Sequence, residues 1–391
     1  MRTLSRLAPV LFALTLSACA REIPVRADPC ALPQADAEWS VGAPETAGFD
    51  AEALCRVLRD VAAGTDNIHA LLVERRGALV AELYRSGRDR PISVRYGFNN
   101  LFGAPTHFDA DALHDARSVS KSIVSLLYGI ALANGRAPAV DTPVLEVQPA
   151  VSPPWAGSNR VTMGQLLSMS SGLDWAEWGK GLLTSDEIRL FWKLDQDRFV
   201  LERPLANGPG TTFNYNGGGT TVIANALVRL SGKPLSELAR EDLFAPLGIA
   251  HFEWTEDVHG RALPFAGLRL RPRDMLKLGR LVNARGNWRG RQVVPADWIA
   301  ESLRPRLSTG MKFLSLDGKP MAYGYQWWLG QVAWGGGEVD WAIALGNGGQ
   351  RIFVVPKLEL SVVLTSGDYD EVPIHLAENR VLRALVSAVT R

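Results

Sequence analysis

Apolar positions alternate in short runs near both ends of the chain, and between these runs they follow the spacing of helices. Near the start, residues 68–73 and 78–84 are two strand-like runs separated by the short, glycine-containing loop 74–77. A loop of this kind between two such runs predicts a β-hairpin. Ahead of the hairpin, residues 51–62 predict a helix with Asp50 as its N-cap.

The rest of the chain passes through a helical middle and then returns to strand-like patterns. Helical patterns dominate residues 162–247. Later elements are predicted as helices at 273–285, 295–303 and 372–389 and as strands at 323–331, 341–345 and 351–366. This order predicts an α/β (α+β) domain built from residues 49–132 and 263–391, with a helical domain, residues 133–262, inserted between the two parts.

A serine and a lysine stand three residues apart where an apolar helix begins. Ser118 and Lys121 precede the apolar run 123–132, and the spacing puts both side chains on one helix face. None of the other seven lysines has a serine three residues before it. Burial would shift Lys121 toward its neutral form, which could take the proton of the Ser118 hydroxyl. The alternative is a solvated helix N-terminus, but the apolar run favours a catalytic pair.

Composition and charge narrow the functional classes. The 391 residues are 47% hydrophobic and 21% charged, which suffices for a large core and two structural units. The chain has 42 Lys and Arg against 41 Asp and Glu, and without residues 1–18, which hold two arginines, the balance is 40 against 41. This near-neutral balance gives no electrostatic reason to expect a nucleic-acid partner.

The first residues have the layout of a secretory signal. Arg2 and Arg6 precede the apolar run 7–16, which is too short to span a membrane. The stretch 16–19, Leu-Ser-Ala-Cys, resembles the bacterial lipobox, in which the cysteine becomes the lipidated N-terminus. This predicts a signal peptide at 1–18, a lipid anchor on Cys19 and a leader at 19–48, although an ordinary signal with an incidental cysteine is the alternative.

Two further cysteines, Cys30 and Cys55, remain besides the predicted anchor at Cys19. By resemblance, Ala20 after Cys19 favours the outer membrane, facing the periplasm of a bacterial cell envelope. In that oxidising compartment Cys30 and Cys55 are expected to form a disulfide that pins the leader to the first helix. Two free, buried thiols are the alternative.

Two glycine-rich stretches add candidate chemistry. Tyr215 stands in the turn 213–219 before another apolar helical run, and with Ser118 and Lys121 it could relay protons. Residues 344–356 form a strand interrupted by glycines, which marks a bulge or a place where a ligand approaches the backbone. The backbone N–H groups of Ser118 and Gln350 could then form an oxyanion hole. Taken alone, these stretches would be a turn with a packed tyrosine and a β-bulge.

The order of these motifs resembles the serine β-lactamase and penicillin-binding superfamily, and within it the class C-like esterases and 6-aminohexanoate-dimer hydrolases. The motifs are S-x-x-K, then Y-N-x-G-G at Tyr215, then G-x-G-G at 346–349. The resemblance covers roughly residues 45 to 390. Supporting stretches are 161–173, 243–249, 271–274 and 323–328.

The resemblance implies a β-lactamase-like fold, an antiparallel sheet flanked by helices with an inserted all-helical region. It also implies substrate contacts from Asn347, Gly348, Gly349 and Gly217, and Trp175 is placed on the cleft wall by its position after the turn 171–173. The chain departs from the family pattern in two places: Gly217 replaces an Asn or Ser, and Asn347 replaces a Lys or His. Arg351 and Arg117 could replace the missing cation.

The predicted function is a serine hydrolase, a carboxylesterase or amidase, that forms an acyl-enzyme on Ser118 with Lys121 and Tyr215 as base and acid. Its partner would be a small ester or amide, with no organic cofactor, and the six histidines lack metal-ligand spacing. One alternative is a β-lactamase or D-Ala peptide hydrolase with the same site. Another is a catalytically inactive, lipid-anchored cell-wall binding protein.

Overall fold

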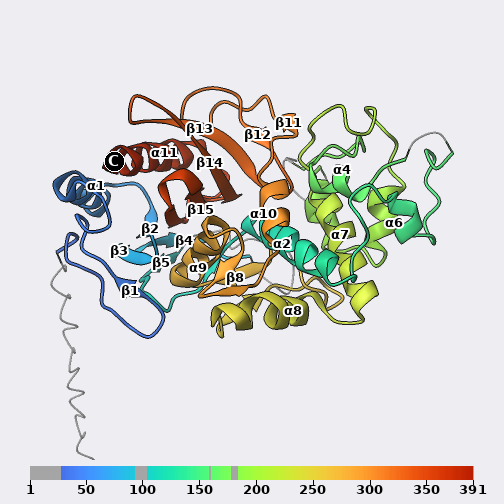
Figure 1. Cartoon of the computed structure of the whole chain (residues 1–391). Coiled ribbons are helices and arrows are strands. Elements are labelled where there is room, and N and C mark those ends of the chain that lie inside the picture. Colours follow the sequence, from blue (N-terminus) through green and yellow to red (C-terminus); the bar gives the residue numbers. More distant parts are fainter. Residues whose placement is uncertain (1–27, 93–103, 158–159, 178–183, 391) are drawn as a thin grey trace, which may run out of the picture.

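A nine-stranded sheet forms the centre of the protein (Figure 1), for which a computed structural model describes residues 28–92, 104–157, 160–177 and 184–390. From edge to edge the strands are β1 (Ser40–Val41), β3 (Ala78–Tyr84), β2 (Ile68–Arg75), β16 (Leu360–Ser366), β15 (Gln350–Val355), β14 (Gly337–Gly346), β13 (Trp328–Trp334), β12 (Ala322–Tyr323) and β11 (Leu307–Ser308). Apart from the parallel pair β1–β3, neighbouring strands are antiparallel, and the predicted antiparallel sheet from both ends of the chain is confirmed.

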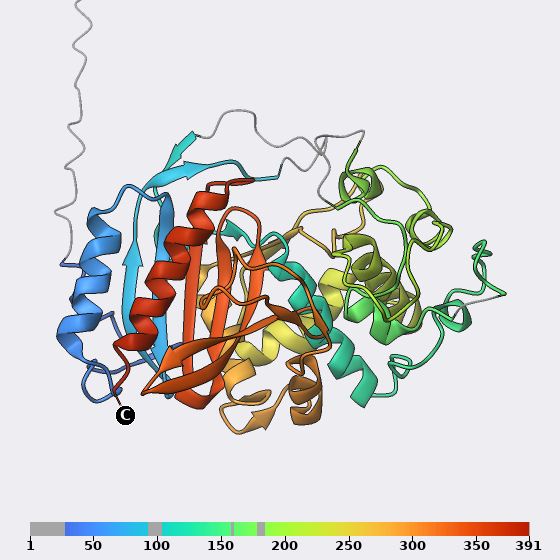
Figure 2. The same ribbon diagram turned by 90° about the horizontal axis from the view of Figure 1, so that it is seen from above.

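Helices cover both faces of this sheet. On one face, α11 (Val372–Ser387) packs on β13 and β16 and lies beside α1 (Ala51–Ala63), as Figure 2 shows. On the other face, α9 (Pro272–Asn283) packs on β2, β15 and β16. The central strands are buried on both faces. Successive residues such as Ile352 and Phe353 therefore pack into the two different hydrophobic cores, and the sequence of each central strand is a continuous apolar run.

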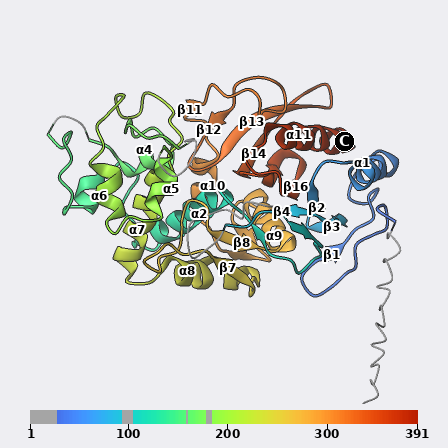
Figure 3. The same ribbon diagram turned by 180° about the vertical axis from the view of Figure 1, so that it is seen from behind.

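Helices, most of them short, make up most of the region inserted between the two parts of the sheet. They are α3 (Val144–Val147), α4 (Met163–Leu167), α5 (Asp186–Leu190), α6 (Gln196–Leu201), α7 (Gly217–Ser231) and α8 (Leu235–Leu238), followed by the π-helix η1 (Ala239–Phe244) and the 3-10 helix η2 (Ala245–Leu247). Between this region and the sheet lies α2 (Val119–Ala133), which contacts α7, β14 and β15 (Figure 3). Beside α2 packs α10 (Ala296–Ser302).

Some elements differ from the sequence prediction. The region 133–262 also contains β7 (Phe252–Trp254), which joins β8 (Leu268–Leu270) and β6 (His114–Asp115) in a three-stranded sheet. A three-residue strand is too short to show a period. The predicted strand 323–331 is divided into β12 and β13. Smaller pairs are β4 (Gly87–Asp89) with β5 (Ala104–Thr106) and β9 (Asn287–Trp288) with β10 (Arg291–Gln292), and η3 (Pro356–Leu358) joins β15 to β16.

The predicted hairpin is present, with a tighter turn than expected. β2 extends to Arg75 and β3 begins at Ala78, so Arg76 and Gly77 alone make the turn. Their φ angles are 50° and 87°, the left-handed pair that suits the twist of a two-residue hairpin.

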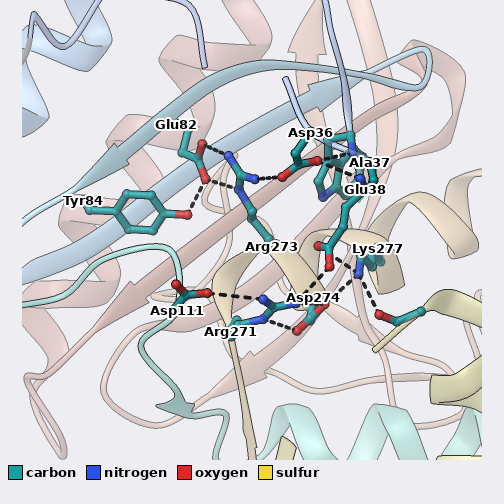
Figure 4. A network of polar contacts seen from close by, with 12 residues as sticks. Asp36, Ala37, Glu38, Glu82, Tyr84, Asp111, Arg271, Arg273, Asp274 and Lys277 are labelled. Carbon is teal, nitrogen blue, oxygen red and sulfur yellow. Dashed lines mark hydrogen bonds and ion pairs between the residues drawn. The ribbon is translucent and has the colours of Figure 1, made fainter. Parts of the chain in front are cut away.

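The described part of the leader, residues 28–48, is bound to the folded domain. Cys30 and Cys55 form a disulfide with a Cα–Cα distance of 5.2 Å, which by loop-closure entropy contributes roughly 3 kcal/mol to stability. Figure 4 shows Asp36 and Glu38 in an ionic network with side chains of α9. Glu38 lies 3.1 Å from Lys277, and Arg273 links Asp36 to the β3 side chain Glu82.

The signal segment 1–18 and Cys19 lie outside the described residues. Across the ranges that are described, every helix is too short or too polar to cross a bilayer.

Candidate active site

Ser118 stands at the N-terminus of α2, next to a residue in a left-handed conformation. Arg117 has a φ of 51°, and its guanidinium lies over the Tyr369 ring at 4.1 Å and donates to the Arg90 carbonyl. Ser118 is partly exposed, whereas the residues of α2 that follow are buried. Ser120 donates to the Arg117 carbonyl at 2.7 Å, which fixes this helix start. The Ser118 hydroxyl is therefore held on rigid backbone where it can be reached from outside.

Lys121 contacts Ser118 as the helical spacing predicts. Its Nζ lies 2.9 Å from Ser118 Oγ, and the side chain is 1% exposed. The same Nζ lies 3.0 Å from Glu187 Oε2, 3.1 Å from the Phe265 carbonyl and 3.2 Å from Glu177 Oε1. The site therefore places two carboxyl groups against one buried ammonium.

The prediction that burial makes Lys121 neutral is wrong. Burial alone lowers the pKa of this amine, but the nearby Glu187 and Glu177 carboxyl groups and the Tyr215 phenol outweigh it. The net result is a pKa raised above the usual lysine value, so the resting side chain is an ammonium. Sequence reasoning counted the desolvation and lacked the carboxylates.

Tyr215 also reaches Ser118. It lies directly before α7, is buried, and hydrogen-bonds with the Ser118 hydroxyl. The Lys121 Nζ lies 4.8 Å from the centroid of its ring, and the ring stacks on Trp328 at 5.4 Å. Burial raises the pKa of the Tyr215 phenol, which keeps it protonated. The structure therefore brings Ser118, Lys121 and Tyr215 together.

Glu177 and Glu187 are the part of the site that the sequence analysis missed. Glu177 Oε2 accepts hydrogen bonds from Trp175 Nε1 at 2.6 Å and from the Gly217 backbone N–H at 2.8 Å. The two carboxyl groups also hydrogen-bond to each other. Burial and the adjacent Glu177 raise the pKa of Glu187. The pKa of Glu177 is lowered, because Lys121 and these hydrogen bonds outweigh its burial.

Gly217 provides the room for this carboxyl pair. A Cβ at position 217 would lie 2.7 Å from Glu187 Oε2 and 3.1 Å from Glu177 Oε1. The carboxyl oxygens thus occupy the space that a side chain at 217 would need. The glycine at a position where the resembling family has Asn or Ser was therefore a signal in the sequence for a rearrangement at this point.

Trp175, which was predicted to lie on the cleft wall, is buried behind the carboxyl pair. Its indole N–H is directed to Glu177, and a Cβ at position 218 would lie 2.7 Å from its ring. Its observed contact with the site is therefore through Glu177.

The glycine-rich turn 347–349 joins β14 to β15 close to the start of α2. A Cβ at Gly346 would lie 2.3 Å from the Ala116 carbonyl oxygen, so the strand end approaches the nucleophile segment closely. Gly348 and Gly349 have φ angles of 86° and 95°, which favour glycine. Gln350 is buried and begins β15. An oxyanion hole made by the N–H groups of Ser118 and Gln350 stays a prediction.

Asn347 is engaged with a neighbouring acidic residue. Its Nδ2 donates to Asp370 Oδ1 at 2.7 Å, and its Oδ1 accepts from the Asp370 N–H at 2.8 Å. The suggestion that Arg351 could replace the missing cation is wrong, because Arg351 is buried and its Nε lies 2.7 Å from Glu378. Arg117 is likewise buried, against Tyr369.

Among the described residues, no group of three or more His, Cys, Asp or Glu side chains is arranged to hold a metal ion. The polar groups that the structure brings together at this site are the Ser118 hydroxyl, the Lys121 amine, the Tyr215 phenol and the carboxyl groups of Glu177 and Glu187.

Comparison with known proteins identifies a matching family and solved structures with the same fold. A family model described as Beta-lactamase matches residues 69–386. A protein described as a 6-aminohexanoate-dimer hydrolase from Bacillus anthracis superposes with a TM-score of 0.65 at 17% identity, covering 92% of this chain and 89% of its own. A penicillin-binding protein homologue from Caulobacter crescentus superposes with a TM-score of 0.62 at 18% identity, covering 85% of this chain and 97% of its own. A family VIII carboxylesterase superposes with a TM-score of 0.61 at 17% identity, with the same two coverages. At these identities the likeness shows a common fold.

Proposed function

The chain belongs to the Beta-lactamase family, and from this and the site geometry we propose that it is a serine hydrolase that forms an acyl-enzyme on Ser118. The observation that carries the proposal is the 2.9 Å contact between Ser118 Oγ and Lys121 Nζ, with Tyr215 hydrogen-bonded to the same hydroxyl. A nucleophile held beside two groups that can move its proton is the arrangement that covalent catalysis requires.

Acylation would use both Lys121 and Tyr215 to move protons. Ser118 Oγ attacks the substrate carbonyl carbon while its proton passes to the neutral form of Lys121. The developing oxyanion is held by the N–H groups of Ser118 and Gln350. When the bond to the leaving group breaks, Tyr215 gives its proton to the departing oxygen or nitrogen, and Lys121 returns a proton to the Tyr215 phenolate. The Ser118 proton is thus transferred in effect to the leaving group.

Deacylation follows the same route with water as the nucleophile. The water proton passes to the neutral form of Lys121, the acyl–oxygen bond to Ser118 breaks, and Ser118 takes up a proton from Tyr215, which Lys121 then reprotonates. The products are the free acid and a restored hydroxyl, so the cycle consumes only substrate and water.

Asn347 and Asp370 favour esters over β-lactams as substrates. A substrate carboxylate near the turn 347–349 would meet an amide already bonded to Asp370, together with that residue's negative charge. Losing a charge-assisted contact is worth roughly 1.5 to 3 kcal/mol, or about 10 to 100-fold in binding. The neutral acyl and alcohol parts of a simple ester bear no such penalty.

We therefore expect kcat/KM for a short-chain p-nitrophenyl ester to exceed that for nitrocefin by at least about 10-fold. The double variant Asn347→Lys/Asp370→Asn should raise nitrocefin turnover by about 10-fold, since the new lysine is then free of Asp370. Asn347→Lys alone is the matched control, in which Asp370 captures the cation. If nitrocefin is the better substrate of the unmodified enzyme, the β-lactamase alternative takes the place of the esterase.

The same proposal includes attachment to the bacterial cell envelope through Cys19. The signal-like segment 1–18 and the lipobox-like stretch support it, and two kinds of acyl attachment on one cysteine would anchor the protein stably. Mass spectrometry of the mature protein should find an N-terminal, acylated Cys19, and Cys19→Ala should release the protein into the soluble periplasmic fraction. An unmodified Cys19 in membrane-bound protein would contradict the lipid anchor.

A further inference from the structure

We infer that Glu177 controls the charge of Lys121, so that its carboxylate sets the pH above which Ser118 can be acylated. Glu177 is in this sense a positioning residue, since it acts on the proton acceptor and not on the substrate. The inference rests on the proposed function of Ser118 and Lys121 and assigns the regulation of that site to a residue outside its three motifs.

The first support is the way in which Glu177 is held. Its side chain is 3% exposed, and one oxygen accepts from both Trp175 Nε1 and the Gly217 N–H while the other lies 3.2 Å from Lys121 Nζ. Donors arranged in this way stabilise the charged form of a carboxyl group. Glu177 is therefore a fixed negative charge beside the amine.

Glu187 has a different environment. Its side chain is 23% exposed, its Oε2 lies 3.0 Å from Lys121 Nζ, and it hydrogen-bonds with the carboxylate of Glu177. Two carboxyl groups that share a hydrogen bond cannot both be ionised cheaply, so one of them keeps a proton. Because Trp175 Nε1 and the Gly217 N–H donate to Glu177, the negative charge lies on Glu177 and the proton on Glu187.

The charge of Glu177 acts on both possible proton acceptors. Together with Glu187 it raises the pKa of Lys121, and together with burial it raises the pKa of Tyr215, so the proton-accepting form of either group is scarce near neutral pH. Acylation should then become faster as the pH rises. The ionisable groups that surround the site from the packed elements are Lys121, Glu177, Glu187, Tyr215 and Tyr323, with Asp186 paired to Arg189 and Arg203 behind them.

A purely structural role would give a different result. The carboxyl pair could have only a structural role, holding residue 177 and helix α5 against the start of α7. In that case a glutamine, which has the same shape as glutamate, would serve equally well, and the pH dependence of Ser118 acylation would not change. Glu177→Gln keeps the shape and removes the charge. The position of the pH profile therefore separates control of charge from support of the fold.

The experiment is the second-order rate of labelling by a fluorophosphonate probe, measured as a function of pH. In the unmodified enzyme this rate should still rise above about pH 8, because the pKa of an ordinary lysine is already about 10.4. Glu177→Gln should move the rising limb to lower pH by at least about one unit, the size of shift that a neighbouring charge produces. Glu187→Gln should move it less, and the exposed control Glu241→Gln should leave it in place.

Each contrary result has a distinct meaning. If the rising limb of the pH profile of Glu177→Gln stays in place or moves to higher pH, the inference is overturned. If Glu187→Gln shifts the limb as far as Glu177→Gln does, the assignment of the negative charge to Glu177 is overturned. If Glu177→Gln does not fold, the unmodified enzyme still decides, since a plateau already reached below about pH 7 would contradict the inference. Absence of labelling at every pH would instead refute the proposed function.

Discussion

Replacing Ser118 with alanine is expected to reduce ester hydrolysis by about 10⁴-fold or more. The hydroxyl is the atom on which the acyl-enzyme forms, and Lys121 and Tyr215 have no other role in the proposed cycle than to move its proton. Because Ser118 is partly exposed at the helix start, losing one oxygen should leave the fold intact. The measurement is kcat/KM for a p-nitrophenyl ester together with the thermal midpoint, Tm.

Ser308→Ala on the edge strand β11 is the matched control, because this serine is exposed and is not among the contacts found for Ser118, Lys121 and Tyr215. It should retain full activity. Ester hydrolysis by Ser118→Ala at the rate of the unmodified enzyme would refute the nucleophile assignment and with it the family-based function.

Lys121→Ala is expected to lower kcat/KM by about 10²-fold or more and to destabilise the protein as well. The loss of activity follows from removal of the proton acceptor beside Ser118. The loss of stability follows because Glu177 remains buried without its partner, which costs about 3 kcal/mol or more unless the carboxylate takes up a proton. Activity and Tm should therefore fall together.

The double variant Lys121→Met/Glu177→Gln separates these two effects. It removes the charge from both partners, so Tm should recover much of the loss seen in Lys121→Ala, while the activity should stay low. Recovery of activity in the double variant would show that Lys121 serves to neutralise Glu177 and is not needed for proton transfer.

Local patterns were sufficient to predict the sheet, most helices and the contact between Ser118 and Lys121. Ser118 and Lys121 share a helix, so their contact follows from a spacing of three residues. Tyr215 comes from a distant segment, and its placement beside them could be expected only through the resemblance to a known family. The hairpin followed from its two apolar runs, while the exact turn depended on the left-handed pair Arg76 and Gly77.

The charge state of Lys121 could not be predicted, because it depends on contacts between distant segments. Glu187 lies 66 positions away from Lys121 in the sequence. No local pattern shows that its carboxyl group meets Lys121. Desolvation could be inferred from the apolar run after Ser118, but its effect has the opposite sign to that of the two carboxyl groups.

The ionic attachment of the leader could not be predicted for a similar reason. Its attachment depends on Asp36 and Arg273, which are 237 positions apart, and on a two-residue strand, β1, paired with β3. An acidic stretch read alone is compatible with a solvated linker. Its ionic partners on α9 become apparent only in the folded protein (Figure 4).

The most direct test of the proposed acyl-enzyme is intact-mass analysis after incubation with a fluorophosphonate, followed by mapping of the modified peptide. The expected result is a single addition of one probe per chain, carried by Ser118, and no addition in Ser118→Ala. A chain that gains no mass, or one that carries the probe on another residue, would contradict a covalent mechanism at Ser118.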